Sequence, residues 1–218
     1  RSMGVVLKPE FLKVKRSSDR EVLDREILYE ILDAGQVAHV GIADDREFPI
    51  VIPLAYVRDG DRILLHGSTG SRIFRKLASG VKACVTVTLL DGIVAARSAF
   101  HSSMNYRSAM IFGTATVLAD DQKELALEIF TNNLIPGRWQ EVRPMTAKEA
   151  AATMVLAIEL TNISGKARTG GPDDEPAEDV VLPIWAGEIP INTSLGDPVP
   201  AADLPAGIRV SPAIKNLK

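Results

Sequence analysis

The stretch Ile63-Leu64-Leu65-His66-Gly67-Ser68-Thr69-Gly70-Ser71-Arg72 changes from apolar to small and hydroxylated side chains within a few residues. The apolar part predicts a strand, and Ser71 to Leu77 predict a short helix, so a tight turn joins them. Backbone N–H groups at a helix start lack partners in the helix and favour an anion. The hydroxyl groups of the turn and the Arg72 guanidinium would add donors that suit phosphate oxygens.

Neither of the two common phosphate motifs, GxxxxGK[ST] and GxGxxG, occurs at this turn. The same pattern also suits an ordinary polar turn between a strand and a helix, so both interpretations stay open. His66 ends the predicted strand beside the turn, and a titratable group at such a place is a candidate functional residue. The alternative is that His66 has a purely structural role.

Other β-strand patterns surround this stretch, and turns rich in Asp and Gly separate several of them. The predicted strands cover residues 37–43, 49–57, 62–65, 81–90, 109–118 and 154–163. Short strands joined by tight turns indicate an antiparallel sheet that curls into a barrel. We therefore predict a mainly β protein of the α+β class, with the helices at the periphery of an antiparallel barrel.

The helix patterns lie between and beside these strands. A helix is expected from Ser18 or Asp19 to Ala34, where Gly35 stops it, and another at 122–132 after Asp120. Thr146 is expected to cap a short Ala-rich helix. Residues 1–18 read as an irregular arm and residues 170–218 as an extended segment that starts with a mobile loop, 170–176. No repeat or linker divides the chain, so we predict one domain, 1–218.

The bulk composition excludes several classes of protein. The 218 residues carry a formal net charge of -3, which argues against nucleic acid as a partner. Cys84 is the lone cysteine, which excludes an internal disulfide and suits a reducing compartment. No apolar stretch reaches the roughly 18 residues of a membrane span, and no signal-peptide pattern is present. We expect a cytoplasmic protein without a membrane partner, and no metal site, because the histidines lack ligand spacing.

Five motifs, in this order along the chain, resemble those of the flavin-binding split-barrel superfamily of pyridoxamine 5'-phosphate oxidase. The resemblance is closest to its nitroimidazole-resistance-like branch, covers roughly residues 16–191, and implies a split barrel. The motifs are Phe48-Pro49-Ile50-Val51-Ile52-Pro53-Leu54; Leu65-His66-Gly67-Ser68 with Gly70-Ser71-Arg72; Asn105-Tyr106-Arg107-Ser108 with Phe112-Gly113; Ser164-Gly165-Lys166-Ala167-Arg168; and Trp185-Ala186-Gly187-Glu188-Ile189-Pro190.

Proteins of this superfamily bind FMN in a cleft at a homodimer interface, and the resemblance implies a role for each matching residue. Ser71 and Arg72 would hold the phosphate, and Lys76 or Arg75 could replace the lysine that the oxidase has where this chain has Ile73. The other implied contacts are Val51, Ile52, Pro53 and Leu54 along the flavin ring, His66, Gly67 and Ser68 near the phosphate and ribityl chain, Ser108 as a polar contact, and Trp185 from the C-terminal segment.

The resemblance implies a flavin-dependent reductase or oxidase that passes hydride through FMN to or from a small planar substrate. His66 would be the polar group beside the flavin, and NAD(P)H would dock transiently, because no nicotinamide-binding motif occurs. A flavin- or haem-binding protein without turnover is the alternative, serving storage, sensing or protection, and a bare dimerisation module is a third. The sequence does not distinguish FMN from FAD or a deazaflavin as the cofactor. The C-terminal arginine-and-histidine signature of the oxidase itself is absent.

Overall fold

The structure is a computed structural model that describes residues 9–43, 48–173 and 175–217. The strands are β1 (Glu21–Val22), β2 (Val37–Ile42), β3 (Ile50–Asp59), β4 (Arg62–Ser68), β5 (Lys82–Ala95), β6 (Ser103–Thr114), β7 (Thr116–Val117), β8 (Thr153–Glu159), β9 (Ile163–Arg168) and β10 (Gly187–Pro190). The helices are α1 (Arg25–Ala34), α2 (Arg72–Ala78), α3 (Asp120–Leu134), α4 (Ala147–Ala152), α5 (Ala177–Val180) and α6 (Pro212–Lys215), with short 3-10 helices η1 (Glu10–Leu12), η2 (Ser18–Arg20) and η3 (Arg138–Glu141). No helix in these ranges is both long and apolar enough to cross a membrane.

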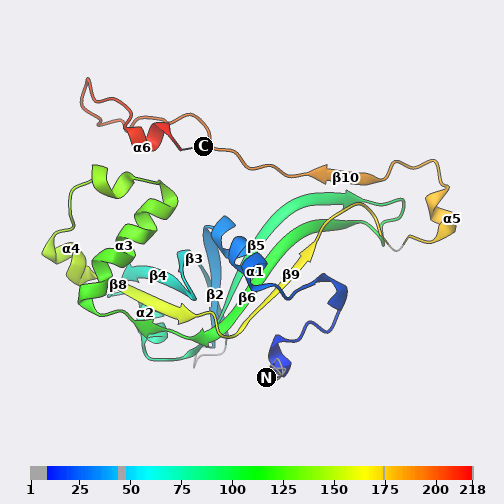
Figure 1. Ribbon diagram of the computed structural model, residues 1–218, viewed down its shortest axis with the longest axis horizontal. Helices are drawn as coiled ribbons and strands as arrows, with labels where there is room; N and C mark the ends of the chain where they lie inside the picture. The colour runs from blue at the N-terminus through cyan, green and yellow to red at the C-terminus, as the bar shows by residue number, and fades with distance from the viewer. Residues whose placement is uncertain (1–8, 44–47, 174, 218) are drawn as a thin grey trace, which may run out of the picture.

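The strands form one antiparallel sheet in the order β1-β9-β6-β5-β2-β3-β4-β8-β7, and β10 adds beside β5 (Figure 1). The end strands β1 and β7 do not pair with each other within the described ranges, so the sheet curls without closing. Helices surround it. This architecture confirms the predicted α+β split barrel.

The barrel is split along β3, which changes its partner partway. Residues 50–55 of β3 pair with β2, from Ile42↔Ile50 to Val37↔Ala55. Residues 56–59 pair with β4, but that ladder runs only from Tyr56↔Leu65 to Asp59↔Arg62. Beyond it, residues 66–68 of β4 pair with β8 alone among the described strands. The first half of β3 and the last residues of β4 therefore face each other as unpaired edges.

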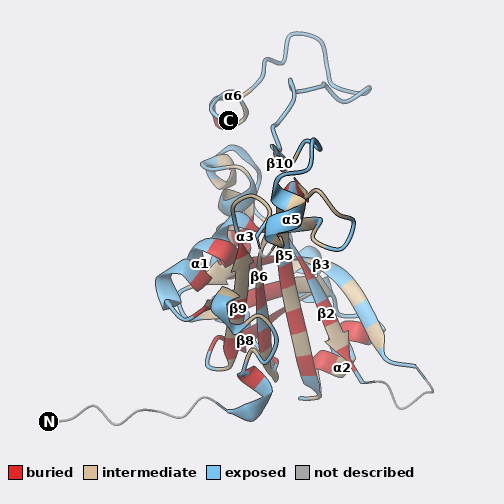
Figure 2. Ribbon diagram, turned by 90° about the vertical axis from the view of Figure 1, so that its right-hand side faces the viewer, coloured by how far each residue is buried: buried red, intermediate tan, exposed pale blue. Residues whose placement is uncertain are grey.

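Burial alternates along the strands, as the red and tan segments of Figure 2 show. It builds two apolar clusters on opposite sides of β4. Ile63 and Leu65 belong to the larger cluster, inside the barrel, which α1 covers with Leu28, Ile31 and Leu32. Leu64 belongs to the smaller cluster, where Leu127 and Phe130 of α3 pack against β4 and β8. This alternation is the period-two pattern of a strand that is buried on both faces.

The far ends of β5 and β6 project from the barrel as an arm (Figure 1). β5 has 14 residues, whereas β2 pairs only with its residues 83–86. A bulge between Leu90 and Gly92 lies where the arm leaves the barrel. On the arm, β10 takes the place beside β5 that β2 occupies in the barrel, pairing Gly187–Pro190 with residues 92–95.

The predicted helix from Ser18 or Asp19 is wrong at its start, because α1 begins at Arg25. The Asp24 carboxylate accepts the N–H of Glu26 and is the true N-cap. The residues just before it pair with β9 as β1, so a tertiary ladder overrides local helix propensity there. Residues 44–47, where the sequence predicts a turn between two strands, and residues 1–8 of the predicted arm lie outside the described residues.

Several strands run further than the sequence predicts. β4 continues through His66 to Ser68, and β6 begins at Ser103, before the predicted start at residue 109. The predicted strand at 154–163 ends at Glu159, and β9 follows it as a separate strand. The expected cap at Thr146 is confirmed by a capping box with Glu149.

Tyr56 sits where the β3–β4 ladder ends, and its buried hydroxyl donates to the Leu32 carbonyl over 2.5 Å. Leu32 lies in the last turn of α1, where carbonyls lack helical partners. Tyr56→Phe leaves that carbonyl without its donor and is expected to lower the free energy of unfolding by about 1–2 kcal/mol. Urea denaturation measures this change.

Tyr106→Phe is the control, because the half-buried Tyr106 hydroxyl has no hydrogen bond within the part of the chain that the structure describes. Its effect is expected to stay below about 0.5 kcal/mol. Equal losses in the two variants would contradict the assignment.

Candidate functional site

The split between β3 and β4 brings together most of the residues that the sequence singled out. Val51 is 63% exposed, and Pro53 is exposed as well, whereas Ile52 and Leu54 turn inward and pack on the barrel core. Pro53 lies opposite His39 of β2. Proline has no N–H to donate, so a strand tolerates it only where that position needs no ladder bond. Its place here agrees with an open edge on the side of the split.

His66 is the candidate polar group of the split. Its side chain points to the α3 side of β4, where its ring meets Phe130 edge-on at a centroid distance of 4.3 Å. Its Nδ1 is buried and has no hydrogen-bond partner among the described residues. Burial lowers the pKa of His66, so the imidazole is neutral at pH 7. A neutral imidazole with a free nitrogen can accept a proton, accept a hydrogen bond or ligate a metal.

The turn after β4 is held tightly by its own backbone and by α2. A Cβ on Gly67 would come within 2.4 Å of the Phe74 ring, so only glycine allows Phe74 to pack there. The Ser68 hydroxyl accepts the N–H of Gly70 over 3.1 Å, and the Ser68 carbonyl accepts the N–H of Ser71 over 3.0 Å. The turn is therefore rigid and delivers Ser71 and Arg72 to a fixed place beside the split.

Ser71 and Arg72 are available for a ligand at that place. The Ser71 side chain makes no capping hydrogen bond with α2. Arg72 is exposed, and its guanidinium has no hydrogen bond or ion pair in the described part of the chain. Lys76, in contrast, is already engaged in an interaction of its own. A guanidinium and a hydroxyl side by side can bind a phosphate oxygen pair.

Ser108 and Trp185 are not brought to the split of their own chain. Ser108 lies on β6, three strands from β3, or about 14 Å at the usual strand spacing, and its hydroxyl donates to the Lys166 carbonyl over 3.2 Å. Trp185 is 65% exposed and lies between α5 and β10, on the arm (Figure 1). A single chain thus assembles the ring-side strand, His66 and the phosphate turn, but not these two residues.

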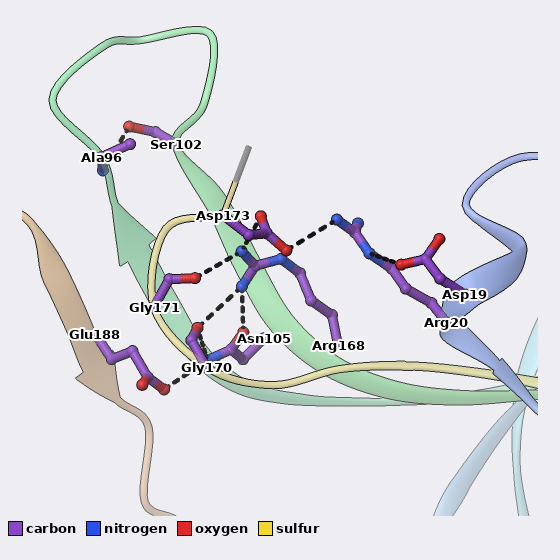
Figure 3. Close-up of polar contacts among 10 residues, drawn as sticks. All are labelled: Asp19, Arg20, Ala96, Ser102, Asn105, Arg168, Gly170, Gly171, Asp173 and Glu188. Atoms are coloured by element: carbon purple, nitrogen blue, oxygen red, sulfur yellow. Dashed lines mark hydrogen bonds and ion pairs between the residues drawn. The ribbon is translucent and has the colours of Figure 1, made fainter. Parts of the chain in front are cut away.

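A buried ionic cluster that the sequence did not predict lies on the arm (Figure 3). Arg168 is only 3% exposed, and its guanidinium donates to Asn105 Oδ1 over 2.6 Å and to Asp173 Oδ1 over 2.8 Å. It also donates to the carbonyls of Gly170 and Gly171. The amide of Asn105 donates to Glu188 Oε2 of β10 over 2.8 Å. We call these residues the Arg168 cluster.

The Arg168 cluster joins three of the quoted motifs, those that contain Asn105, Arg168 and Glu188. A buried guanidinium needs partners for its charge and its N–H groups, and removing one is costly. The cluster therefore fixes β10 and the loop after β9. Glu175 in that loop also accepts from the Arg97 guanidinium over 2.9 Å. The described residues of this predicted mobile loop are thus held in place by hydrogen bonds. The signal in the sequence is the run Arg168-Thr169-Gly170-Gly171-Pro172-Asp173, since glycine carbonyls can turn back on a nearby arginine.

The open antiparallel sheet and the split along β3 define a split-barrel protein. A family model described as pyridoxamine 5'-phosphate oxidase matches residues 24–167. The chain belongs to this pyridoxamine 5'-phosphate oxidase family, as the resemblance implied. No curated protein matches the sequence significantly.

Three solved structures are similar over much of their length. The FAD and haem binding protein of Mycobacterium smegmatis is 43% identical, with 91% of this chain and 97% of that chain covered and a TM-score of 0.87. The flavocytochrome Anf3 of Azotobacter vinelandii is 37% identical, with 96% and 97% covered and a TM-score of 0.90. A candidate 5-nitroimidazole antibiotic resistance protein of Bacteroides thetaiotaomicron is 20% identical, with 67% and 85% covered and a TM-score of 0.57, and shares the fold.

The lowered pKa of His66 makes the free energy of unfolding depend on pH. As the pH falls below about 6.5, the unfolded chain takes up the histidine proton before the folded chain does, so folding becomes less favourable. The loss continues until the pH reaches the folded pKa. Between about pH 7.5 and about pH 5.5 the wild type is expected to lose more thermal stability than His66→Gln.

Thermal unfolding followed by circular dichroism at the two pH values measures this difference. His39→Gln is the control, since His39 is exposed on β2, and it is expected to keep the wild-type response. An equal loss in His66→Gln and in the wild type would show that His66 is not the group responsible.

Proposed function

We propose that this protein binds a flavin and a haem and transfers electrons between them, with the flavin in the split between β3 and β4. The observation that carries the proposal is the 43% identity to the FAD and haem binding protein of M. smegmatis across 91% of this chain and 97% of that one. The similarity to the flavocytochrome Anf3 supports it independently.

The residues of the split fit a flavin. The isoalloxazine ring needs a flat apolar slot with a few directed polar groups, and the unpaired edges of β3 and β4 offer one. Val51 and Pro53 would lie along the ring, and Ser71 with Arg72 would hold a phosphate. A bound flavin supplies hydride acceptance and one-electron transfer, and the protein supplies orientation and control of water.

The flavin we propose is FAD, because FAD is the flavin named for the protein that is 43% identical. FMN, which the family resemblance implies, is the alternative. Both carry the phosphate that the Ser71–Arg72 pair would bind, so the pair does not discriminate between them. Phosphodiesterase treatment of the released cofactor does, since it converts FAD to FMN and raises its fluorescence.

His66 is the proposed haem ligand. A haem iron is held by its macrocycle and needs only one or two axial side chains. The described residues contain no group of three His, Cys, Asp or Glu side chains that could hold a bare metal ion, so a single histidine is the relevant feature. His66 fits, because its buried Nδ1 has no partner and its pKa is lowered. His39, exposed on β2, is the other candidate.

A homodimer belongs to the same proposal. Ser108 and Trp185 resemble flavin contacts but lie away from the split of their own chain, so a second copy would bring them to it.

NAD(P)H docking transiently over the flavin is the proposed electron donor. Turnover of a small planar substrate by a flavin-dependent oxidoreductase is a second candidate, which bleaching of the flavin by anaerobic NAD(P)H followed by reoxidation with the substrate would favour.

The phosphate role of Arg72 predicts a loss of flavin affinity in Arg72→Ala. Charge-assisted hydrogen bonds to phosphate are worth about 1.5–3 kcal/mol, so the dissociation constant is expected to rise about 10- to 100-fold. Quenching of flavin fluorescence during titration of the cofactor-free protein measures it for FAD and FMN. Arg16→Ala removes another exposed charge, from the N-terminal segment, and is expected to bind as the wild type does. No uptake of either flavin by the wild type would overturn the proposal.

The haem role predicts that His66→Ala loses haem but keeps flavin, because the His66 ring lies on the α3 side of β4 against Phe130 and Arg72 would still hold the flavin phosphate. Loss of a supporting contact to a metal ligand already costs about 10- to 100-fold in affinity, so loss of the ligand itself is expected to cost at least as much. The Soret absorbance of protein reconstituted with haem measures the occupancy, and the flavin bands serve as an internal reference. His101→Ala is the control. Retention of the Soret band in His66→Ala and its loss in His39→Ala would move the ligand to β2.

A further inference from the structure

Residues 191–210, which we call the C-terminal strap, lie outside both apolar clusters. Every one of these residues is exposed. The strap runs from β10 on the arm back across the molecule to α6, which contacts η3, without adding a strand to the sheet (Figure 1). A segment of this length that touched nothing would gain no contact energy to offset the conformational entropy lost on ordering, about 1–2 kcal/mol for each residue.

Both ends of the strap are anchored. At the arm, β10 pairs with β5, Glu188 is held by the Arg168 cluster (Figure 3), and the Ile191 N–H donates to the Asp91 carbonyl over 2.9 Å. At the other end, Glu141 of η3 accepts the N–H of Ala213 over 2.9 Å and the hydroxyl of Ser211. The strap is thus held at two fixed points and spans the distance between them.

The strap carries few charges and several exposed apolar side chains. Three of its twenty residues are charged, against 24% of the whole chain, and charged residues are depleted where proteins meet. Its exposed apolar side chains include Leu195, Val199 and Ile208. They line a hollow of about 1160 Å³ between the strap, α6 and η3. That volume exceeds the roughly 300–1,000 Å³ of a typical small-molecule pocket.

We propose that the C-terminal strap clasps a second copy of this chain. The inference rests on the homodimer of the proposed function and names the segment that holds it together. A two-fold interface must be self-complementary, and the same chain offers a matching surface. Exposed apolar side chains lie on its sheet, at Val37, Val51, Leu90, Ile93 and Met110. The 20 residues of the strap and these five fall within the roughly 20–30 residues that a stable interface uses on each side.

A matched pair of leucine variants tests the clasp, because Leu195 in the strap and Leu125 on α3 are both 61% exposed. Leu195→Asp places a charge in the proposed interface and is expected to raise the dimer dissociation constant at least about 100-fold. Leu125→Asp is expected to leave it within about threefold of the wild type. Sedimentation velocity over a range of concentrations measures the constant, against the 23.5 kDa mass of one chain.

The outcomes separate the clasp from the proposed function. A wild-type dimer that Leu195→Asp leaves unchanged overturns the clasp and leaves flavin and haem binding untouched. A dimeric Leu195→Asp that no longer binds flavin or haem overturns it too, because the strap then covers the cofactor. A monomeric wild type overturns both the clasp and the homodimer.

A second measurement reads the contact directly in the full chain. The photocrosslinker p-benzoylphenylalanine replaces Val199, which is 90% exposed, and chains with natural nitrogen are mixed with ¹⁵N-labelled chains. Crosslinked peptides that combine the two labels are expected, and their sequences identify the surface that the strap contacts. Crosslinks confined to one label overturn the clasp even if the substitution at Leu195 weakens the dimer for another reason.

Discussion

The ladder between β3 and β4 ends at Tyr56 and Leu65, and the arrangement of the other elements depends on that ending. On one side of it, β3 continues the sheet of β2, β5 and β6; on the other, β4 continues with β8 and β7. Tyr56 lies at the fork, the point where β3 and β4 separate, and its hydroxyl donates a hydrogen bond to the last turn of α1. Because that contact positions α1 over the larger cluster, the same residue supports the fork and the core. The split is thus built into the hydrogen-bond pattern of the backbone.

Local patterns were sufficient to predict the class of fold and the turn after β4. The apolar run before His66, the cap at Thr146 and the alternation along the strands all report on near neighbours, which local sequence records well. β1 and β9 escaped prediction because their pairing joins residues about 145 apart, with Glu21 opposite Lys166. Nothing near Val22 in the sequence specifies that ladder. The same reason hid the Arg168 cluster, which draws its members from β6, β9 and β10.

The residues of the candidate site also fall into those that the sequence could place and those that it could not. His66, Ser71 and Arg72 are close in the sequence, so one motif was enough to place them together. Ser108 and Trp185 matched family motifs, but motif order carries no information on whether a contact forms within one chain or between two. The buried charge of Arg168 is a different kind of feature: it adds little net stability compared with apolar packing, but it accepts few alternative arrangements. Such a group suits a junction where the direction of a chain must be fixed.

Pro53 has a consequence for the protein before any ligand is bound. An unpaired strand edge is a template on which other chains can add strands, and an open edge of apolar residues is prone to such addition. A proline in the middle of that edge removes one N–H from the row and prevents a foreign strand from forming a continuous ladder. Pro53 therefore also lowers the tendency of the newly made chain to aggregate through this edge.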